Sequence, residues 1–284
     1  MSEQLQKQAI ELAWRHWTVL GVAGVAPLPE HAVDLEALIA FTPFIAAADP
    51  RLERECLDWC VRIGPSNVSI SRLRQIVRLM PARGDTTALD LPIIMIEAAS
   101  GRPSRTKLSN KSRSPRLAHP SLIQLRSRRI FGVSARADLI VALATRARNA
   151  EAGRISSILP VGYTKRTVAL IFDDLADAGV LEELVVTQAA SYKPLKIAPL
   201  RALLAPLPKK TPSWPERFAL VAAILETWRR FGTRAPTSYA IELAKVLDKL
   251  RPLAARIGEK PPIIGRPQAI LDDLERWSSS VLAP

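Results

Sequence analysis

Histidine, cysteine and tyrosine are scarce in this chain, which limits the chemistry expected of it. Its 284 residues include three histidines, two cysteines and three tyrosines. Cys56 and Cys60 stand four apart with no second Cys/His pair, so we interpret them as packed, reduced thiols rather than half of a metal site. The sequence also lacks a phosphate-binding glycine loop, a zinc-protease helix motif and a nucleophile elbow. We therefore predict no catalytic residues, no metal and no cofactor.

Glycine and long apolar runs are also scarce. The chain has 12 glycines against 23 prolines, a balance that favours helices separated by sharp stops. No apolar run reaches the 18 residues that a membrane span requires. The opening MSEQLQKQ has neither a basic start nor an apolar stretch, so we expect no secretory signal and a cytoplasmic location. Hydrophobic residues make up 48%, which excludes a disordered chain.

Acidic residues are absent from one long segment. Residues 98–137 hold ten Lys/Arg and no Asp/Glu, and they account for most of the net charge of +13. Such a block is typical of a polyanion-binding surface, although a solvated basic linker has the same composition. Residues 100–116 show no apolar period and are rich in Ser, Arg, Lys and Pro. We predict a flexible basic linker over residues 100–121.

Helical patterns fill both ends of the chain. Residues 1–99 contain helix-start signals at Asp34, Asp49-Pro50 and Ser69, each before an apolar pattern of helical period. Arg72, Arg74 and Arg78 lie on polar positions of the helix after Ser69, which indicates a solvated face or, alternatively, a second DNA-reading helix. Residues 206–284 contain three further helical patterns. We predict an N-terminal helical domain (1–99) and a separate C-terminal helical subdomain (206–284).

Residues 134–198 have a more informative order of elements. Ser134 and Thr164 can each cap a helix, and a short helix is predicted between them over Arg154–Leu159. A tight turn over 160–163 contains glycine, and two β-rich runs follow at Leu184–Thr187 and Tyr192–Ile197. Helix, short helix, turn, helix and hairpin is the plan of a winged helix-turn-helix.

The sequence TKRTVALIFDDLADAGVLEE within this region resembles the recognition helix and first wing strand of bacterial MarR-like and ArsR-like regulators. The run HPSLIQLRSRRIFGVSARADLIVAL is similar to that of bacterial winged-helix proteins accompanying nucleotidyltransferase-type toxins. The resemblance implies a winged helix-turn-helix domain over 122–205 that binds double-stranded DNA, commonly as a homodimer.

Positive side chains in the first turn of the third helix support this implication. Recognition helices meet bases and phosphates with this turn, and an arginine there can read guanine. Three later acids, Asp173, Asp174 and Asp177, argue against deep lengthwise insertion. A winged helix used only for protein contacts is the alternative. The predicted DNA-binding residues are Tyr163, Thr164, Lys165, Arg166, Thr167, Ala169, Leu170, Tyr192, Lys193, Lys196, Arg126, Arg128 and Arg129.

The sequence thus predicts a mainly α protein: a winged helix-turn-helix with a small β-hairpin wing, flanked by N- and C-terminal helical subdomains. The expected function is sequence-specific transcriptional regulation, most often repression, and not enzymatic catalysis. The alternative is an antitoxin or defence-system accessory that binds a partner protein and its own promoter.

Overall fold

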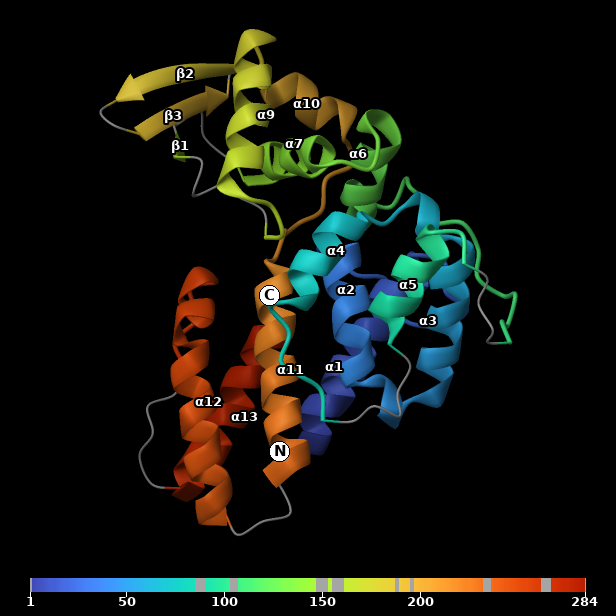
Figure 1. Cartoon of the computed structure of the whole chain (residues 1–284), viewed down its shortest axis with the longest axis vertical. Helices are drawn as coiled ribbons and strands as arrows, with labels where there is room; N and C mark the ends of the chain where they lie inside the picture. The colour runs from blue at the N-terminus through green and yellow to red at the C-terminus, as the bar shows by residue number, and fades with distance from the viewer. Residues whose placement is uncertain are drawn as a thin grey trace.

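A computed structural model shows that the chain is mainly helical, as predicted (Figure 1). The structure describes residues 2–84, 90–102, 107–146, 153–154, 161–186, 189–194, 197–231, 236–261 and 267–283. No helix in these ranges is both long and apolar enough to cross a membrane.

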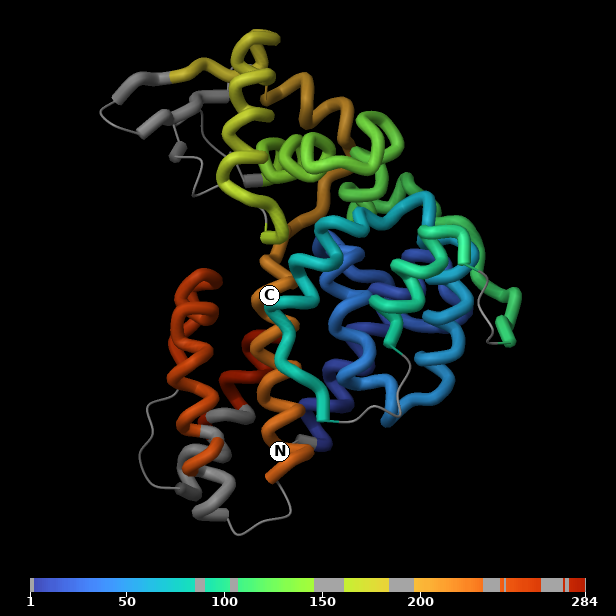
Figure 2. The backbone as a smooth tube through the Cα atoms, in the orientation of Figure 1, coloured from blue at the N-terminus to red at the C-terminus, as the bar shows by residue number. Residues whose placement is uncertain are grey.

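Two groups of helices, from opposite ends of the chain, build the larger part of the molecule, which we call the helical body. Figure 1 shows them side by side, and Figure 2 shows both chain termini within this body. Its helices are α1 (Ser2–Val19), α2 (Leu35–Phe41), α3 (Pro50–Arg62), α4 (Ile70–Val77), α5 (Leu91–Ala99), α11 (Trp214–Phe231), α12 (Pro236–Arg256) and α13 (Pro267–Leu282).

The N-terminal signals read from the sequence are confirmed. Asp34 accepts a hydrogen bond from Ala37 N at the start of α2, and Asp49 caps α3 ahead of Pro50. Ser69 likewise caps α4 by accepting from Arg72 N. These side chains satisfy backbone N–H groups that lack a partner in the first helical turn.

The predicted division into separate N- and C-terminal subdomains is wrong at the level of the core. Buried side chains of α1–α5 and of α11–α13 form one continuous hydrophobic cluster. Phe41 of α2 stacks on Phe218 of α11 with ring centroids 4.4 Å apart. Trp214 Nε1 donates to the Ala32 carbonyl across 182 residues of sequence. The two ends therefore fold as one body, and the middle of the chain is inserted between them.

The inserted unit lies at one end of the helical body (Figure 1). Leu139 and Leu143 of one helix pack against Val168 and Phe172 of another to form a second, smaller core. β2 and β3 pair antiparallel from Leu181↔Pro194 to Val186↔Ala189, and β1 pairs with the other edge of β3. The elements of the unit are α6 (Ile123–Phe131), α7 (Ala135–Arg146), β1 (Gly153–Arg154), α9 (Lys165–Asp177), β2 (Leu181–Val186), β3 (Ala189–Pro194) and α10 (Ile197–Leu203).

Within this unit the capping predictions are confirmed. Ser134 Oγ accepts from Ala137 N, and Thr164 Oγ1 accepts from Thr167 N. The short helix predicted over Arg154–Leu159 is wrong at Arg154, which lies in β1, and its other residues lie outside the described ranges. Residues 189–191, predicted as loop, belong to β3 because they pair with 184–186 of β2.

Residues 107–121 were predicted as part of a flexible linker, and the structure contradicts this. Asp58 accepts hydrogen bonds from Asn110 N at 2.7 Å and Ser112 N at 2.9 Å, while Glu55 accepts from Ser109 Oγ. Arg113 N donates to Gly21 O, and a Cβ at Gly21 would lie 2.0 Å from Arg113 O. The two buried acids of α3 supply the partners that this polar segment could not supply for itself.

Candidate nucleic-acid interface

A buried ionic network joins the inserted unit to the helical body. It contains three carboxylates, Asp34, Glu36 and Asp138, and two guanidiniums, Arg72 and Arg128. The side chains of Glu36, Arg72 and Arg128 are 0%, 4% and 2% exposed. Charges that are removed from water to this degree must be paired, so the network fixes the relative position of the two parts.

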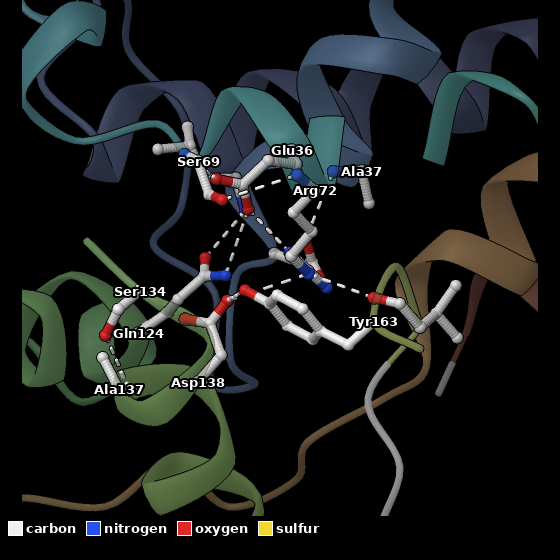
Figure 3. Close-up of polar contacts among 12 residues, drawn as sticks. Glu36, Ala37, Ser69, Arg72, Gln124, Ser134, Ala137, Asp138 and Tyr163 are labelled. Atoms are coloured by element: carbon white, nitrogen blue, oxygen red, sulfur yellow. Dashed lines mark hydrogen bonds and ion pairs between the residues drawn. The ribbon is translucent and has the colours of Figure 1, made fainter. Parts of the chain in front are cut away.

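Glu36 is the centre of the network (Figure 3). It accepts from Arg72 Nη1 at 2.6 Å, Arg128 Nη1 at 2.6 Å and Ser69 N at 2.7 Å, and also from Gln124 Nε2. Burial by itself would raise the pKa of Glu36, but the charges of Arg128 and Arg72 outweigh burial and lower it to about 2. Glu36 is therefore ionised at neutral pH.

The two arginines reach their partners from different helices. Arg128 of α6 binds Asp138 of α7 through Nε at 2.9 Å and Nη2 at 2.7 Å. Arg72 of α4, which the sequence places on a polar face, is instead buried and binds Asp34 with both Nη atoms, so its predicted exposure is wrong. Burial lowers the pKa of each guanidinium, but the neighbouring carboxylates more than compensate and raise it well above its ordinary value. Both arginines therefore stay charged.

This network also holds the turn before α9. Arg72 Nε donates to Val161 O at 3.1 Å, and Tyr163 Oη donates to Asp138 Oδ2 at 2.6 Å. Gly162 has φ +97°, and a Cβ there would lie 2.7 Å from Arg72 Cγ. Only glycine combines this backbone angle with such a close approach. The N-terminal end of α9 is therefore anchored to α4.

From this anchored end, α9 presents a charged and partly apolar face to solvent. Val168, Phe172 and Leu175 are buried against the smaller core. Lys165 and Arg166 in the first turn are exposed, and Leu170 is 58% exposed. Asp174, one of the acids that opposes DNA contact, forms an ion pair with Arg136 of α7. A cation therefore compensates part of the negative charge in the later half of α9.

Three of the predicted DNA-binding residues have other tasks in this structure. Arg128 is 4% exposed and donates to two carboxylates and Asn67 O, so its assignment as a DNA contact is wrong. Tyr163 directs its hydroxyl to Asp138 and is a positioning residue rather than a contact. Arg126 donates to four backbone carbonyls, those of Leu117, His119, Leu204 and Pro206. Through these bonds Arg126 joins α6 to residues 117–119 and to residues 204–206.

The other predicted contacts are placed as follows. Arg129 is exposed and stays a candidate, as do the exposed Thr164 and the half-buried Thr167 and Ala169. Tyr192 and Lys193 lie in β3, where the structure describes the backbone alone. Lys196 lies outside the described residues. Of the predicted contacts, most of those that the structure leaves exposed therefore lie at the start of α9.

Sequence reasoning missed the ionic network, although one signal for it exists. Glu36 is the single charged residue in the seven-residue helix LEALIAF, whose other positions are all apolar. A carboxylate in such a run is expected to be buried and paired. Its partners lie 36 and 92 residues away, and the local pattern contains no sign of them.

Neither a metal-ligand cluster among the described residues nor a matching known protein accompanies this interface. In the described ranges, His, Cys, Asp and Glu never gather in the groups of three that would hold a metal ion. Cys56 and Cys60 are buried, and burial raises the pKa of both thiols. No protein-family model, curated protein or solved structure matches the chain.

Proposed function

We propose that this protein is a sequence-specific regulator of transcription that binds double-stranded DNA through a winged helix-turn-helix. In this proposal α9 is the recognition helix and β2 with β3 is the wing. The observation that carries it is the exposed basic first turn of α9, Lys165 and Arg166, on a helix whose opposite face is buried. Cations at a helix N-terminus oppose the helix dipole, a cost that an anionic partner would offset.

The anchored turn supports the same proposal. Arg72 and Asp138 fix the backbone of residues 161–163, so the first turn of α9 is held in one place before any partner arrives. Such preorganisation lowers the entropic cost of docking a helix into the major groove. In this proposal Arg166 reads a base edge, and Lys165 and Arg129 contact phosphates. By analogy with such regulators we propose a two-fold symmetric dimer.

Selection of bound sequences from random duplex DNA tests the proposal, followed by affinity measurements over a range of salt concentrations. The full chain should bind with an affinity that falls steeply with salt, with a log–log slope of roughly −0.9 per neutralised phosphate. Arg166→Ala should weaken the preferred site by about 1–3 kcal/mol and relax the preference at one base pair. Lys165→Ala should weaken all sequences alike. Arg251→Ala on the remote helix α12 is the matched control.

A folded protein that binds no duplex at about 50 mM salt would contradict the proposal, because electrostatic binding is strongest there. If Arg166→Ala weakened the affinity for all DNA sequences equally, the protein would still be a DNA-binding protein, but Arg166 would not recognise a base. The second candidate function is that of an accessory or antitoxin that binds a partner protein. The basic groove described next favours it.

A further inference from the structure

A groove on the helical body combines positive charge with apolar surface. It has a volume of about 1040 Å³. One wall is the segment 110–120, held against α3 by Asp58, and the other is the end of α1 with residues 19–28. Its lining contains Lys111, Arg113 and Arg116 and no Asp or Glu.

The cations of this groove are available to a partner. All three side chains are exposed, and none forms an ion pair with another described residue. The segment that carries them has no regular secondary structure, and Lys111 and Arg113 stand on either side of the buried Ser112.

Apolar groups lie beside these cations. Val19 and Val22 line the groove and are buried, and Leu28 on its rim is 50% exposed. Next to Leu28 in the same loop, Val25 is fully exposed. Thr18 also lines this space, and its Oγ1 is buried without a hydrogen-bond partner among the described residues. A ligand with apolar groups would cover the exposed side chain of Leu28.

We propose that this groove binds an extended peptide segment of a partner protein in which acidic and apolar residues alternate. The acidic side chains pair with Lys111, Arg113 and Arg116, and the apolar side chains pack against the exposed Leu28 on the rim. Arginine clusters recognise acidic motifs in this way, and apolar contacts supply affinity that charge alone does not. Duplex DNA matches the charge but not the apolar rim at Leu28, because its outer surface is phosphate and sugar.

Selection from a phage-displayed library of random twelve-residue peptides tests this proposal on the full chain. The expected result is enrichment of peptides that alternate Asp or Glu with apolar residues. Lys111→Glu/Arg113→Glu should weaken a synthetic copy of an enriched peptide at least tenfold. The matched control is Lys245→Glu/Lys249→Glu, which reverses two exposed cations of α12 and should change the affinity less than twofold. Leu28→Asp, an exposed site that tolerates the change, should weaken the peptide by a similar factor to the groove variant.

Circular dichroism and thermal melting confirm that each variant is folded before its binding is compared. Three results would overturn the proposal: no enrichment, enrichment that the groove variant leaves intact, or purely acidic peptides that a random-sequence duplex displaces. The last result would make the groove a nucleic-acid surface. Because Lys165 and Arg166 are unchanged in these variants, DNA binding through α9 stands or fails separately.

Discussion

At the scale of single residues, the arginines divide into two kinds that sequence position does not separate. Arg126, Arg128 and Arg129 are neighbours on α6. Arg128 is buried with two carboxylates, Arg126 binds backbone carbonyls, and Arg129 is exposed. A guanidinium has five donors and no acceptor, so its role depends on which acceptors surround it. Their contributions to stability should differ accordingly.

Arg128→Ala should destabilise the protein by about 3–5 kcal/mol, because it leaves Glu36 and Asp138 buried with fewer compensating charges. Arg129→Ala, one position later and exposed, should change stability by no more than about 0.5 kcal/mol. Urea unfolding followed by circular dichroism measures both. Equal stability of the two variants would show that the network does not hold the inserted unit to the body.

His16 gives a second prediction at this scale. It is fully buried, its Nε2 lies 2.9 Å from Nε2 of His31, and its ring packs against Trp214. Burial, together with the charges of His31 and Arg15, lowers the pKa of His16 well below its ordinary value. In acid the unfolded chain therefore takes up a proton that the folded chain excludes.

Because the folded pKa is the lower one, stability should fall as the pH drops below about 6.5, by up to ~1.4 kcal/mol per pH unit for this histidine. Urea unfolding at pH 7.5 and at pH 5.5 measures the loss. His16→Gln should lose less stability between these two pH values than the unaltered chain. Its free energy of unfolding at pH 7.5 should nevertheless be lower than that of the unaltered chain. The same loss in both proteins would exclude His16 as the source.

At the scale of elements, the basic segment 107–119 shows how a polar sequence becomes ordered without an apolar stripe. Two backbone N–H groups of the segment donate to Asp58, which is fully buried. Burial raises the pKa of Asp58, but hydrogen bonds from Ser112, Asn110 and Arg62 outweigh it and lower the pKa. The order of residues 110–112 therefore depends on this carboxylate of α3, while Glu55 and Gly21 O hold the residues on either side.

Asp58→Asn should release this segment, since an amide carries no charge and offers one fewer acceptor oxygen. Limited trypsin digestion should then cut at Lys111, Arg113 or Arg116 well before it cuts the unaltered chain there. Asp248→Asn on the exposed face of α12 is the control and should leave the cleavage pattern unchanged. Rapid cleavage of the unaltered protein at these sites would restore the flexible-linker interpretation.

At the scale of the whole molecule, the helical body is one core made from both ends of the chain. Leu5 of α1 is 1% exposed in this core, and Ser279 of α13 donates to Gln8 of α1. The smaller core of the inserted unit is centred on Leu143, Val168 and Phe172. A substitution in the larger core should therefore speed hydrogen exchange in helices from both ends of the chain. A substitution in the smaller core should act mainly on the inserted unit.

Leu5→Ala should cost about 2–5 kcal/mol and increase hydrogen exchange in α1 and in α11–α13 to a similar degree. Leu143→Ala, the matched change in the smaller core, should increase exchange in α7 and α9 first. Hydrogen–deuterium exchange with mass spectrometry resolves these peptides. Faster exchange in residues 1–99 alone after Leu5→Ala would show that the two ends fold separately.

Local features of this protein could be predicted from its sequence. The capping roles of Asp34, Asp49, Ser69 and Thr164 were identified correctly. The helical period also predicts inner positions of α9 at Val168, Ile171, Phe172 and Leu175, and all of these are buried except Ile171, which is half-buried. A cap involves residues two or three positions apart, and a helical face follows from a period of 3.6. Helix caps and helical faces therefore depend on residues that are close together in the sequence.

Tertiary structure decided what the charged residues do. Arg128 meets Glu36 across 92 residues, and Asp58 orders Ser112 across 54. The union of the two chain ends depends on contacts such as that of Trp214 with Ala32, across 182 residues. The energy of a charge depends on its burial and its partners, and both are fixed only when distant segments pack together. The sequence by itself therefore determined the helices and their apolar faces, and the fold determined which arginines stay exposed for a partner.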